Sequence, residues 1–149
     1  IMRKRKVNII LRGHGQKPSY KTLTSAGADI YAANHHDIII QPLERKLIPT
    51  GIFMELPTDA EAEVRPRSGL SLKEGIVAIL GTIDSDYQGE IGVILVNLSN
   101  EPVIIKRHDR VAQFVLIGRE GLFQAEWTIT DKFERESERG EGGFGSTGK

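Results

Sequence analysis

The segment Gly81–Gly89 places two acids and one aromatic ring between two strand-like runs. Asp84 stands directly after Ile83, and Tyr87 follows three residues later. The apolar approach predicts a hairpin whose tip presents a partly desolvated carboxylate, which suits a general base. Tyr87 can lie flat against a sugar-like ligand. The alternative is a β-turn in which the acids only accept hydrogen bonds from backbone N–H groups.

The C-terminal segment Arg139–Lys149 is rich in groups that bind phosphate. Beside its glycines it contains Arg139, the ring of Phe144 and the hydroxyls of Ser146 and Thr147. Part of it fits G-x-x-x-x-G-K, but a P-loop also needs a preceding strand and a following helix, which this segment lacks. Such a segment can form an arm that closes over a nucleotide, with Arg139 and backbone N–H groups on phosphate and Phe144 on a base. A disordered tail is the alternative.

Three further polar groups stand in contexts that suit a phosphate ligand. Arg67 and Ser68 end a strand-like run just before a helical turn, where backbone donors, a hydroxyl and a guanidinium can meet phosphate oxygens. An ordinary helix N-cap beside a surface Arg is the alternative. Asp29 stands among small residues, which admit a hydrated metal ion or equally a turn capped by a buried carboxylate. Gln113 lies inside an apolar strand, as a satisfied core amide or as a ligand contact.

A β fold must position these groups, because short β-rich runs separated by turn signals recur along the chain. This pattern favours an all-β jelly roll, sandwich or barrel. Only Ser71–Glu74 has the character of a helical turn. The predicted strands are Val7–Leu11, Asp37–Gln41, Lys46–Leu56, Ala62–Arg67, Ile76–Leu80, Ile91–Leu98, Val103–Arg107, Val111–Ile117 and Ala125–Ile129.

The predicted strand Ile91–Leu98 is apolar almost without alternation, which indicates cover on both faces and hence a second subunit. The charged stretch Thr130–Glu138 predicts a solvated tether. We expect residues 1–130 to form one β domain and residues 131–149 to form the tether and a flexible Gly-rich arm. Fully extended, such a segment can reach a site on its own subunit or on a neighbour.

Composition excludes several classes of function. The 149 residues suit a single domain, and Lys+Arg and Asp+Glu number 20 each, which provides no general basic field for nucleic acid. The absence of Cys excludes disulfides and thiolate metal sites, and the four His show no metal-ligand spacing. No apolar run is long enough to span a membrane, and no signal-like apolar segment follows Arg3–Lys6. We expect an intracellular protein, cytoplasmic or nuclear, or a virion protein if the source is viral.

Five segments, in this order, resemble the motifs of the trimeric dUTPase family, and together they extend over most of the chain. They are Ala26–Tyr31, Pro66–Leu70, Gly81–Gly89, Asp109–Gln113 and Arg139–Gly148. Two departures from the family pattern are visible. His108 precedes Asp109 where a Gly is usual, and Ile79 and Leu80 precede Gly81 where the base-recognition hairpin usually contains another Gly. The second departure bears on base specificity.

The resemblance implies a jelly-roll-like homotrimer with active sites that each use all three subunits. It implies hydrolysis of dUTP to dUMP and pyrophosphate, which limits uracil in DNA and supplies dUMP for dTMP synthesis. Asp84 would deprotonate the water that attacks the α-phosphorus, and Asp29 would hold a water on the bridging Mg²⁺. The implied substrate contacts are Tyr87 on deoxyribose, Gly81 and Ile83 at the uracil edge, Arg67, Ser68, Gly69 and Gln113 on phosphates, Phe144 over uracil, and Arg139, Gly145, Ser146 and Thr147 toward the γ-phosphate.

Two other functions fit parts of the same pattern. dCTP deaminase resembles this family in fold and in some motifs, but its chemistry needs a Glu near the cytosine 4-position, whereas Ile83–Tyr87 has the hydrolase pattern. A non-catalytic nucleotide-binding module is the second alternative. The presence of all the reactive side chains of the motifs argues against it.

Overall fold

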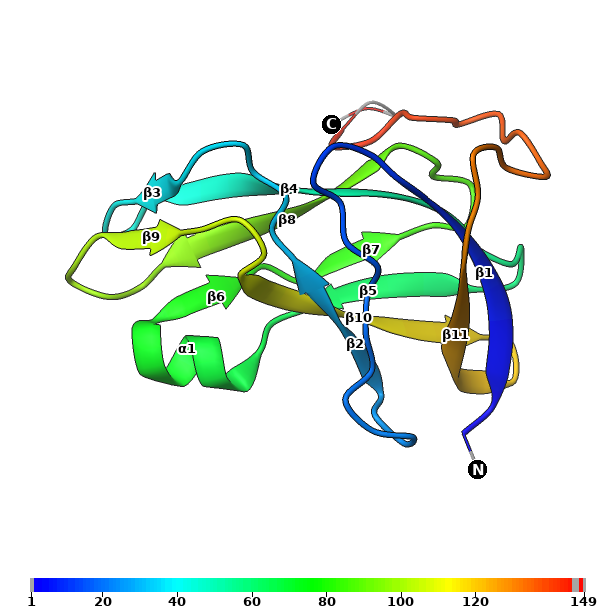
Figure 1. The fold of residues 1–149 in the computed structure, drawn as a ribbon, viewed down its shortest axis with the longest axis horizontal. Coiled ribbons are helices and arrows are strands. Elements are labelled where there is room, and N and C mark those ends of the chain that lie inside the picture. The colour runs from blue at the N-terminus through cyan, green and yellow to red at the C-terminus, as the bar shows by residue number, and fades with distance from the viewer. Residues whose placement is uncertain (1, 146–147, 149) are drawn as a thin grey trace.

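The computed structural model describes residues 2–145 and 148, and within them the fold is almost entirely β (Figure 1). The strands are β1 (Lys4–Leu11), β2 (Gly27–Tyr31), β3 (Ile38–Ile40), β4 (Arg45–Glu55), β5 (Glu61–Arg65), β6 (Ile76–Ala78), β7 (Gly81–Ile83), β8 (Glu90–Asn97), β9 (Val103–Ile105), β10 (Arg110–Gly118) and β11 (Gly121–Ile129). One short helix, α1 (Ser68–Glu74), follows β5.

One curled sheet has the strand order β6-β8-β4-β1-β11-β10-β5-β7, with β2 paired to β10, while β3 and β9 form a separate two-stranded sheet. Strand β11 joins the two halves of the curl, because it pairs in parallel with β1 and in antiparallel with β10. Every other strand pair described is antiparallel. This arrangement confirms the all-β prediction.

The curl encloses one apolar core, to which alternate residues of the strands contribute. In β8 the side chains of Ile91, Val93 and Leu95 are buried, whereas Gly92, Ile94 and Val96 on the opposite face are only half-buried. One face of this apolar strand is therefore covered within the chain and the other is not. The largest fully buried side chains are Phe114, Phe123, Ile9, Ile30, Ile40, Ile48, Ile52, Met54, Leu56, Ile76, Leu95 and Leu116.

The predicted strand Ile76–Leu80 is shorter than expected, and the chain changes neighbours after it. Its first part, β6, pairs with β8, and the backbone N–H of Ile79 still donates to the carbonyl of Ile94 at 2.8 Å. The chain then crosses to the other half of the curl, where β7 pairs with β5. Because β7 and β8 pair with different neighbours, they diverge and do not form the two paired strands of the predicted hairpin, and a cleft opens between them. The loop that joins them, residues 84–89, is called the Asp84 hairpin below, although its flanking strands do not pair with each other.

Two other elements differ from the sequence prediction. Strand β2 was not predicted, because its residues are small and its pairing with β10 joins positions far apart in sequence. Helix α1 begins at Ser68, three residues before the predicted helical turn. Among the described residues, no helix is long and apolar enough to cross a membrane.

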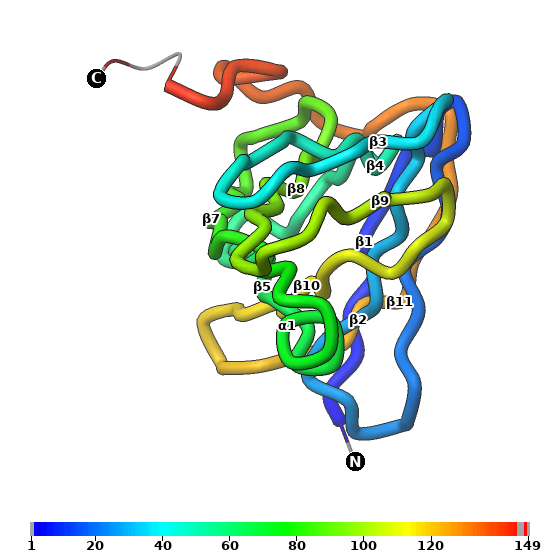
Figure 2. Tube along the Cα trace, turned by 90° about the vertical axis from the view of Figure 1, so that its left-hand side faces the viewer, coloured from blue at the N-terminus to red at the C-terminus, as the bar shows by residue number. Residues whose placement is uncertain are grey.

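The chain from Thr130 onward leaves the end of β11 and crosses the tip between β7 and β8. Figures 1 and 2 both place this segment at the opposite end of the molecule from α1. The expected solvated tether is only partly solvated, because alternate residues from Phe133 to Arg139 are half-buried. The arrangement separates two groups of predicted site residues, one near the C-terminal segment and one near α1.

Candidate active site

Asp84 lies immediately beyond β7, at the start of a tight turn that the backbone N–H of Tyr87 closes by donating to the Asp84 carbonyl at 3.1 Å. Ile83 beside it is buried against β5, so the strand fixes the position from which the carboxylate projects. The side chain of Asp84 is nevertheless 59% exposed. The predicted partial desolvation is therefore absent from the chain alone, and a bound ligand or a partner would have to supply it.

Arg139 reaches the same turn from the C-terminal segment. Its Nη1 lies 2.6 Å from Asp84 Oδ2 and 3.3 Å from Asp86 Oδ1, and its Nε donates to the carbonyl of Gly142 at 2.8 Å. The hydrogen bond to Asp84 raises the pKa of the Arg139 guanidinium above its usual value. An ion pair at this exposure contributes at most about 1 kcal/mol, so a more highly charged ligand can displace it.

Tyr87 stands between the turn and the arm. Its hydroxyl donates to the carbonyl of Glu90 at 2.6 Å, and its ring centroid lies 5.5 Å from the Arg139 guanidinium carbon. A Cβ at Gly89 would lie 2.6 Å from the Tyr87 hydroxyl, and one at Gly143 would lie 2.8 Å from the ring. Glycines at these positions therefore allow the backbone to pack on both sides of the ring. Burial raises the pKa of Tyr87, and Arg139 partly opposes this shift.

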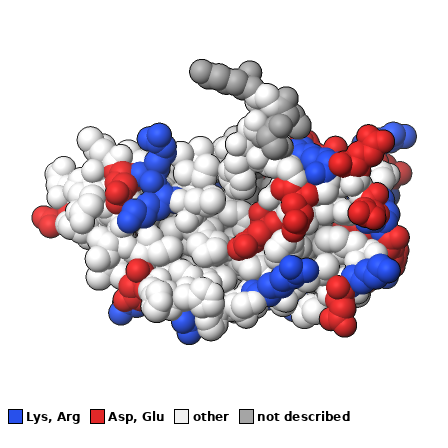
Figure 3. Space-filling model, turned by 90° about the horizontal axis from the view of Figure 1, so that it is seen from above, with Lys and Arg blue, Asp and Glu red and all other residues white. Residues whose placement is uncertain are grey.

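A cleft of about 240 Å³ opens between β7 and β8 beside Tyr87. Its lining is mainly apolar, which suits a flat base, while Tyr87 and Arg139 stand at its margin. Phe144 contributes a ring that is 67% exposed, and Figure 3 shows mostly uncharged surface on one side of the arm and acidic and basic side chains on the other. The lining residues are Val64, Ile79, Leu80, Gly81, Thr82, Ile83, Tyr87, Ile91, Gly92, Ile94, Arg139, Gly143 and Phe144.

The structure thus brings Gly81, Ile83, Tyr87, Arg139 and Phe144 around one cleft, with Asp84 paired to Arg139 at its edge. Gly145 follows Phe144 with φ of 93°, a backbone conformation that favours glycine. Ser146 and Thr147 lie outside the described residues.

A second cluster surrounds Asp29 at the other end of the molecule. Asp29 is 8% exposed on β2, and its carboxylate lies 3.4 Å from Arg67 Nε and 3.5 Å from Arg110 Nη1. Arg67 Nη1 also lies 3.5 Å from the Arg110 carbonyl oxygen. These contacts are long for charge-assisted hydrogen bonds, so both guanidinium groups retain donors for another anion.

Gln113 and the start of α1 border the same cluster. Gln113 lies on β10 opposite Asp29, and its Nε2 donates to the Pro66 carbonyl at 3.0 Å. A Cβ at Gly27 would lie 2.2 Å from Gln113 Oε1, so the amide occupies the space that this glycine leaves. Neither a side-chain cap nor an acid satisfies the first turn of α1, and a Cβ at Gly69 would meet nothing within 4 Å. The backbone donors of Ser68 and Gly69 are therefore open to a ligand.

The two groups of predicted residues do not meet within one chain. Within residues 2–145, no hydrogen bond or ion pair joins the Asp84–Tyr87–Arg139 group to the Asp29–Arg67–Gln113 group. One chain therefore presents an apolar, aromatic-flanked cleft in one place and a cluster suited to phosphate in another.

The residues present fit Mg²⁺ only through water. No group of three or more His, Asp or Glu within the described residues converges as a metal site. Asp29 faces two guanidinium groups, and it has oxygen lone pairs left to accept a hydrogen bond from a metal-bound water. Mg²⁺ in proteins commonly keeps several of its waters and binds directly to substrate phosphates. A contact from Asp29 through one of those waters would suit this mode of binding.

Sequence reasoning missed four side chains around these clusters. Arg110 pairs with Asp29, and Asp86 shares Arg139 with Asp84. Glu55 and Arg135 join the C-terminal segment to the end of β4. An acid that ends an otherwise apolar strand, as Glu55 does after Ile52–Met54, is a signal that could have been noticed. Nothing in the sequence around Arg135 distinguishes it from a solvated charge.

The apolar cleft would suit a flat base and the cluster around Asp29 would suit phosphate, the two kinds of surface that a nucleotide ligand needs. A family model described as dUTPase matches residues 14–148 of this chain. The deoxyuridine 5'-triphosphate nucleotidohydrolase of Wolbachia pipientis subsp. Culex pipiens is 48% identical, covering 97% of this chain and 96% of the relative. The enzyme of that name from Finegoldia magna is also 48% identical, covering 96% and 99%.

Two solved dUTPase structures are also similar to this chain. A variant dUTPase of Staphylococcus bacteriophage 80alpha with dUpNHpp is 26% identical, with a TM-score of 0.69, over 96% of this chain and 98% of that one. A variant dUTPase from phage phi11 of S. aureus shares the fold at 22% identity, with a TM-score of 0.71, over 88% of this chain and 100% of that one. The chain belongs to the dUTPase family.

Proposed function

We propose that this protein hydrolyses dUTP to dUMP and pyrophosphate, and thereby limits uracil in DNA and supplies dUMP for dTMP synthesis. The single observation that carries the proposal is the similarity to relatives named deoxyuridine 5'-triphosphate nucleotidohydrolase, at 48% identity over nearly the whole chain. The cleft beside Tyr87 and the phosphate-type cluster around Asp29 provide the two kinds of surface that such a substrate needs.

In the proposed reaction, Asp84 orients a water and takes its proton as that water attacks the α-phosphorus. Backbone groups of Gly81 and Ile83 read the uracil edge, Tyr87 packs on the deoxyribose, and Phe144 stacks over the base. A general base supplies about 10²–10⁴-fold, so charge neutralisation and positioning must supply the rest. Arg67, Ser68, Gly69 and Gln113 hold the phosphate chain, and Arg139, with Gly145, Ser146 and Thr147, serves the γ-phosphate.

Mg²⁺ is the cofactor we propose, and Asp29 would hold it through a bound water. When bound, it neutralises charge on the phosphate oxygens. The contribution of this chain is to place the Asp29 carboxylate, which two arginines orient, where a metal-bound water can donate to it. A structural Mg(II) ion has been described in the phage phi11 dUTPase.

A homotrimer would unite the two clusters. The outward face of β8 and its surroundings are apolar, and the exposed fractions of Leu47, Ile79 and Leu80 are 53%, 43% and 61%. Such a surface favours a partner subunit. In the proposed assembly, the Asp84 hairpin of one subunit faces the Asp29–Arg67 cluster of a neighbour, and a C-terminal arm covers the resulting site.

The test is pyrophosphate release from dUTP, dCTP, dTTP and UTP with Mg²⁺, with ammonia release from dCTP measured in parallel. We expect pyrophosphate from dUTP in preference to the others and no ammonia. Ammonia from dCTP would identify a deaminase. Binding of dUTP without dUMP formation would identify a non-catalytic module.

Subunit mixing tests the shared site. Asp84→Asn and Arg67→Ala homo-oligomers should each be nearly inactive, whereas co-refolded mixtures regain activity because some sites receive both intact residues. A mixture that stays as inactive as its parents would rule out sites built from more than one chain.

A further inference from the structure

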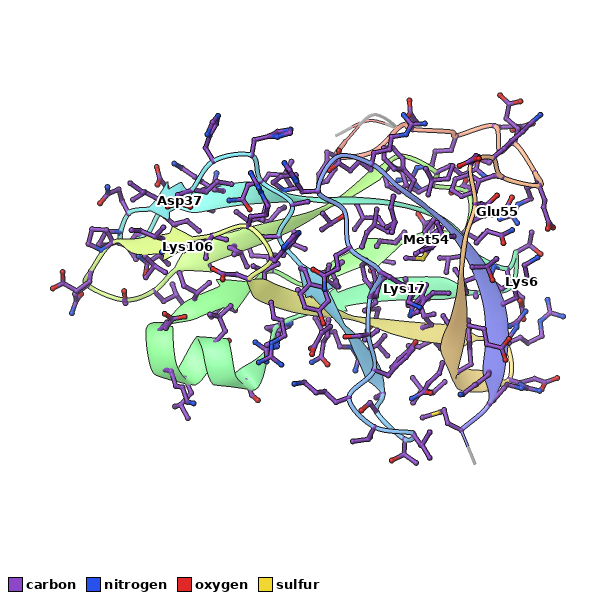
Figure 4. The ribbon with its side chains drawn as sticks, in the orientation of Figure 1. Lys6, Lys17, Asp37, Met54, Glu55 and Lys106 are labelled. Atoms are coloured by element: carbon purple, nitrogen blue, oxygen red, sulfur yellow. The ribbon has the colours of Figure 1, made fainter. Side chains whose placement is uncertain are left out.

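The segment that leads from β11 into the arm is fastened to the hairpin that carries Asp84. The fastening uses a buried acid at the end of β4, Glu55, which is 6% exposed. Figure 4 shows Glu55 beside the segment that follows β11. None of the residues involved is among the substrate contacts proposed above.

Both carboxylate oxygens of Glu55 are used. Oε1 accepts from Asn8 Nδ2 at 2.8 Å and from the backbone N–H of Glu134 at 3.2 Å, and Oε2 accepts from the backbone N–H of Arg135 at 2.7 Å. Burial alone would raise the pKa of Glu55. The hydrogen bonds from Asn8, Arg135 and Glu134, together with the charge of Arg135, outweigh burial and hold the pKa below its usual value.

Arg135 then reaches forward to the hairpin. Its Nη2 donates to the carbonyl of Leu56 at 2.7 Å and to that of Ser85 at 2.9 Å. Ser85 directly follows Asp84 in the chain. A single guanidinium nitrogen therefore ties the carbonyl of the residue that follows the proposed general base to the end of β4.

Gln88 and Ser137 complete the fastening on the other side of Tyr87. Gln88 is 8% exposed, and its Nε2 donates to the Arg135 carbonyl at 2.8 Å while its Oε1 accepts from the Ser137 N–H at 3.3 Å. The Ser137 hydroxyl donates to the Asp86 carbonyl and accepts from the Gly140 N–H at 2.9 Å. The Gln88 N–H in turn donates to the Gly140 carbonyl at 2.6 Å.

We propose that Glu55, Gln88, Arg135 and Ser137, here called the clamp, are positioning residues that fix the Asp84 hairpin and the start of the arm relative to each other. The proposal rests on the proposed dUTP hydrolysis for its catalytic consequence. The clamp holds the carbonyls of Ser85 and Asp86 and the residue Gln88, so the Asp84 carboxylate, the Tyr87 ring and the start of the arm share one rigid frame. A displacement of about 1 Å at a reacting group can cost about 10²-fold in rate, which makes such a frame kinetically significant.

The primary test is Arg135→Met, which keeps an unbranched apolar stem and removes the guanidinium that donates to the Leu56 and Ser85 carbonyls. We expect kcat for dUTP to fall about 10- to 100-fold, because the Ser85 carbonyl, one residue beyond Asp84, loses its tie. Arg135→Lys retains donors and should recover most of that loss. Glu134→Gln is the matched control on the same segment, because its side chain is 74% exposed and only pairs with Lys6. The control should keep kcat within about twofold.

Hydrogen exchange separates positioning from mere stability. The Gln88 and Gly140 amides should exchange faster in Arg135→Met, while amides of the core strands β4 and β8 keep their protection. Equal acceleration in the core would indicate a purely structural role and overturn the proposal. So would wild-type kcat in Arg135→Met, or an equal loss in Glu134→Gln.

A second variant serves if Arg135→Met does not fold. Ser137→Ala removes two clamp bonds from a half-buried site and should lower kcat about 3- to 10-fold with the same local exchange pattern. Unchanged kcat and exchange in a folded Ser137→Ala would overturn the proposal. If the wild-type protein releases no pyrophosphate from dUTP, the proposed function fails, and the exchange measurement still decides whether the clamp fixes the hairpin.

Discussion

The Asp84 turn and the Asp29 cluster each set carboxylate against guanidinium, but the two are built in different ways. The Asp84 side chain is 59% exposed and meets Arg139, which comes from a segment outside the sheet, at 2.6 Å. The Asp29 side chain is 11% exposed and meets Arg67 and Arg110, which adjoin or lie in strands, at 3.4 and 3.5 Å. The Asp84–Arg139 contact is short, but its exposure allows a ligand to displace it. The contacts of Asp29 are longer, but all three residues are held in place by the strands. The displaceable pair at Asp84 would let Arg139 exchange partners during the proposed turnover. The anchored cluster at Asp29 would bind phosphate without moving.

The largest expected effect comes from deleting Arg139–Lys149. Turnover of dUTP should be abolished, because the arm supplies both Arg139 and Phe144, while the thermal midpoint should change little because no core residue is lost. Assays of pyrophosphate release and a thermal melt on the same preparation measure both quantities. A large loss of thermal stability would show that the arm belongs to the structural part of the molecule.

Next is Asp84→Asn, which removes the proposed base with almost no change of shape. We expect kcat to fall at least ~10²-fold while the affinity for a non-hydrolysable dUTP analogue is nearly unchanged. Steady-state kinetics and calorimetric titration provide the two numbers. Full activity in this variant would remove Asp84 from its assigned role.

Asp29→Asn should behave differently, since it leaves two arginines facing each other without their shared anion. We expect unfolding to become easier by about 2 kcal/mol, which corresponds to about 4–8 °C in the melting midpoint. The value of kcat/KM should also fall about tenfold, because a neutral amide holds a metal-bound water less well. If stability is unchanged, the contrast between an anchored and a displaceable carboxylate does not hold.

The smallest effect is expected in acid. The pKa of Glu55 is held below its ordinary value of 4.5, so its contribution to stability is complete above pH 4.5 and is lost as the pH falls through the folded-state pKa. Between pH 5 and pH 3, the melting midpoint of the wild type should therefore fall about 1–3 °C more than that of Glu55→Gln. Parallel pH dependences would mean that Glu55 carries no favourable charge in the folded state.

Much of the sheet could be predicted from the sequence, because β-rich runs between turn signals mark strands locally. The crossing at Ile79–Leu80 could not, since an apolar run does not reveal that the chain leaves β8 at its end and that the next strand, β7, pairs with β5. Strand β2 escaped prediction for a related reason, as Gly27 and Ala28 have low strand propensity and depend on β10.

The motif residues of the site were predicted by resemblance, and those within residues 2–144 lie in two clusters. That division was not visible in the sequence, because it depends on how the curl separates β7 from α1. The contact between Glu55 and Arg135 joins positions 80 residues apart, and a charge in a polar segment gives no local hint of such a partner. The roles assigned to individual residues stay predictions until the variants are measured.

The parallel pairing of β1 with β11 has a consequence for how the protein matures. Lys4 faces Gln124 across this seam, so the sheet closes only after about 120 residues of intervening chain have been brought together. Closing so long a loop is entropically costly, and nonlocal pairing of this kind slows folding. The arm continues from the end of β11. It can therefore reach the Asp84 hairpin only after β11 has paired with β1. During refolding, activity should therefore return at the rate at which β1 pairs with β11, and not at the faster rate at which local hairpins form.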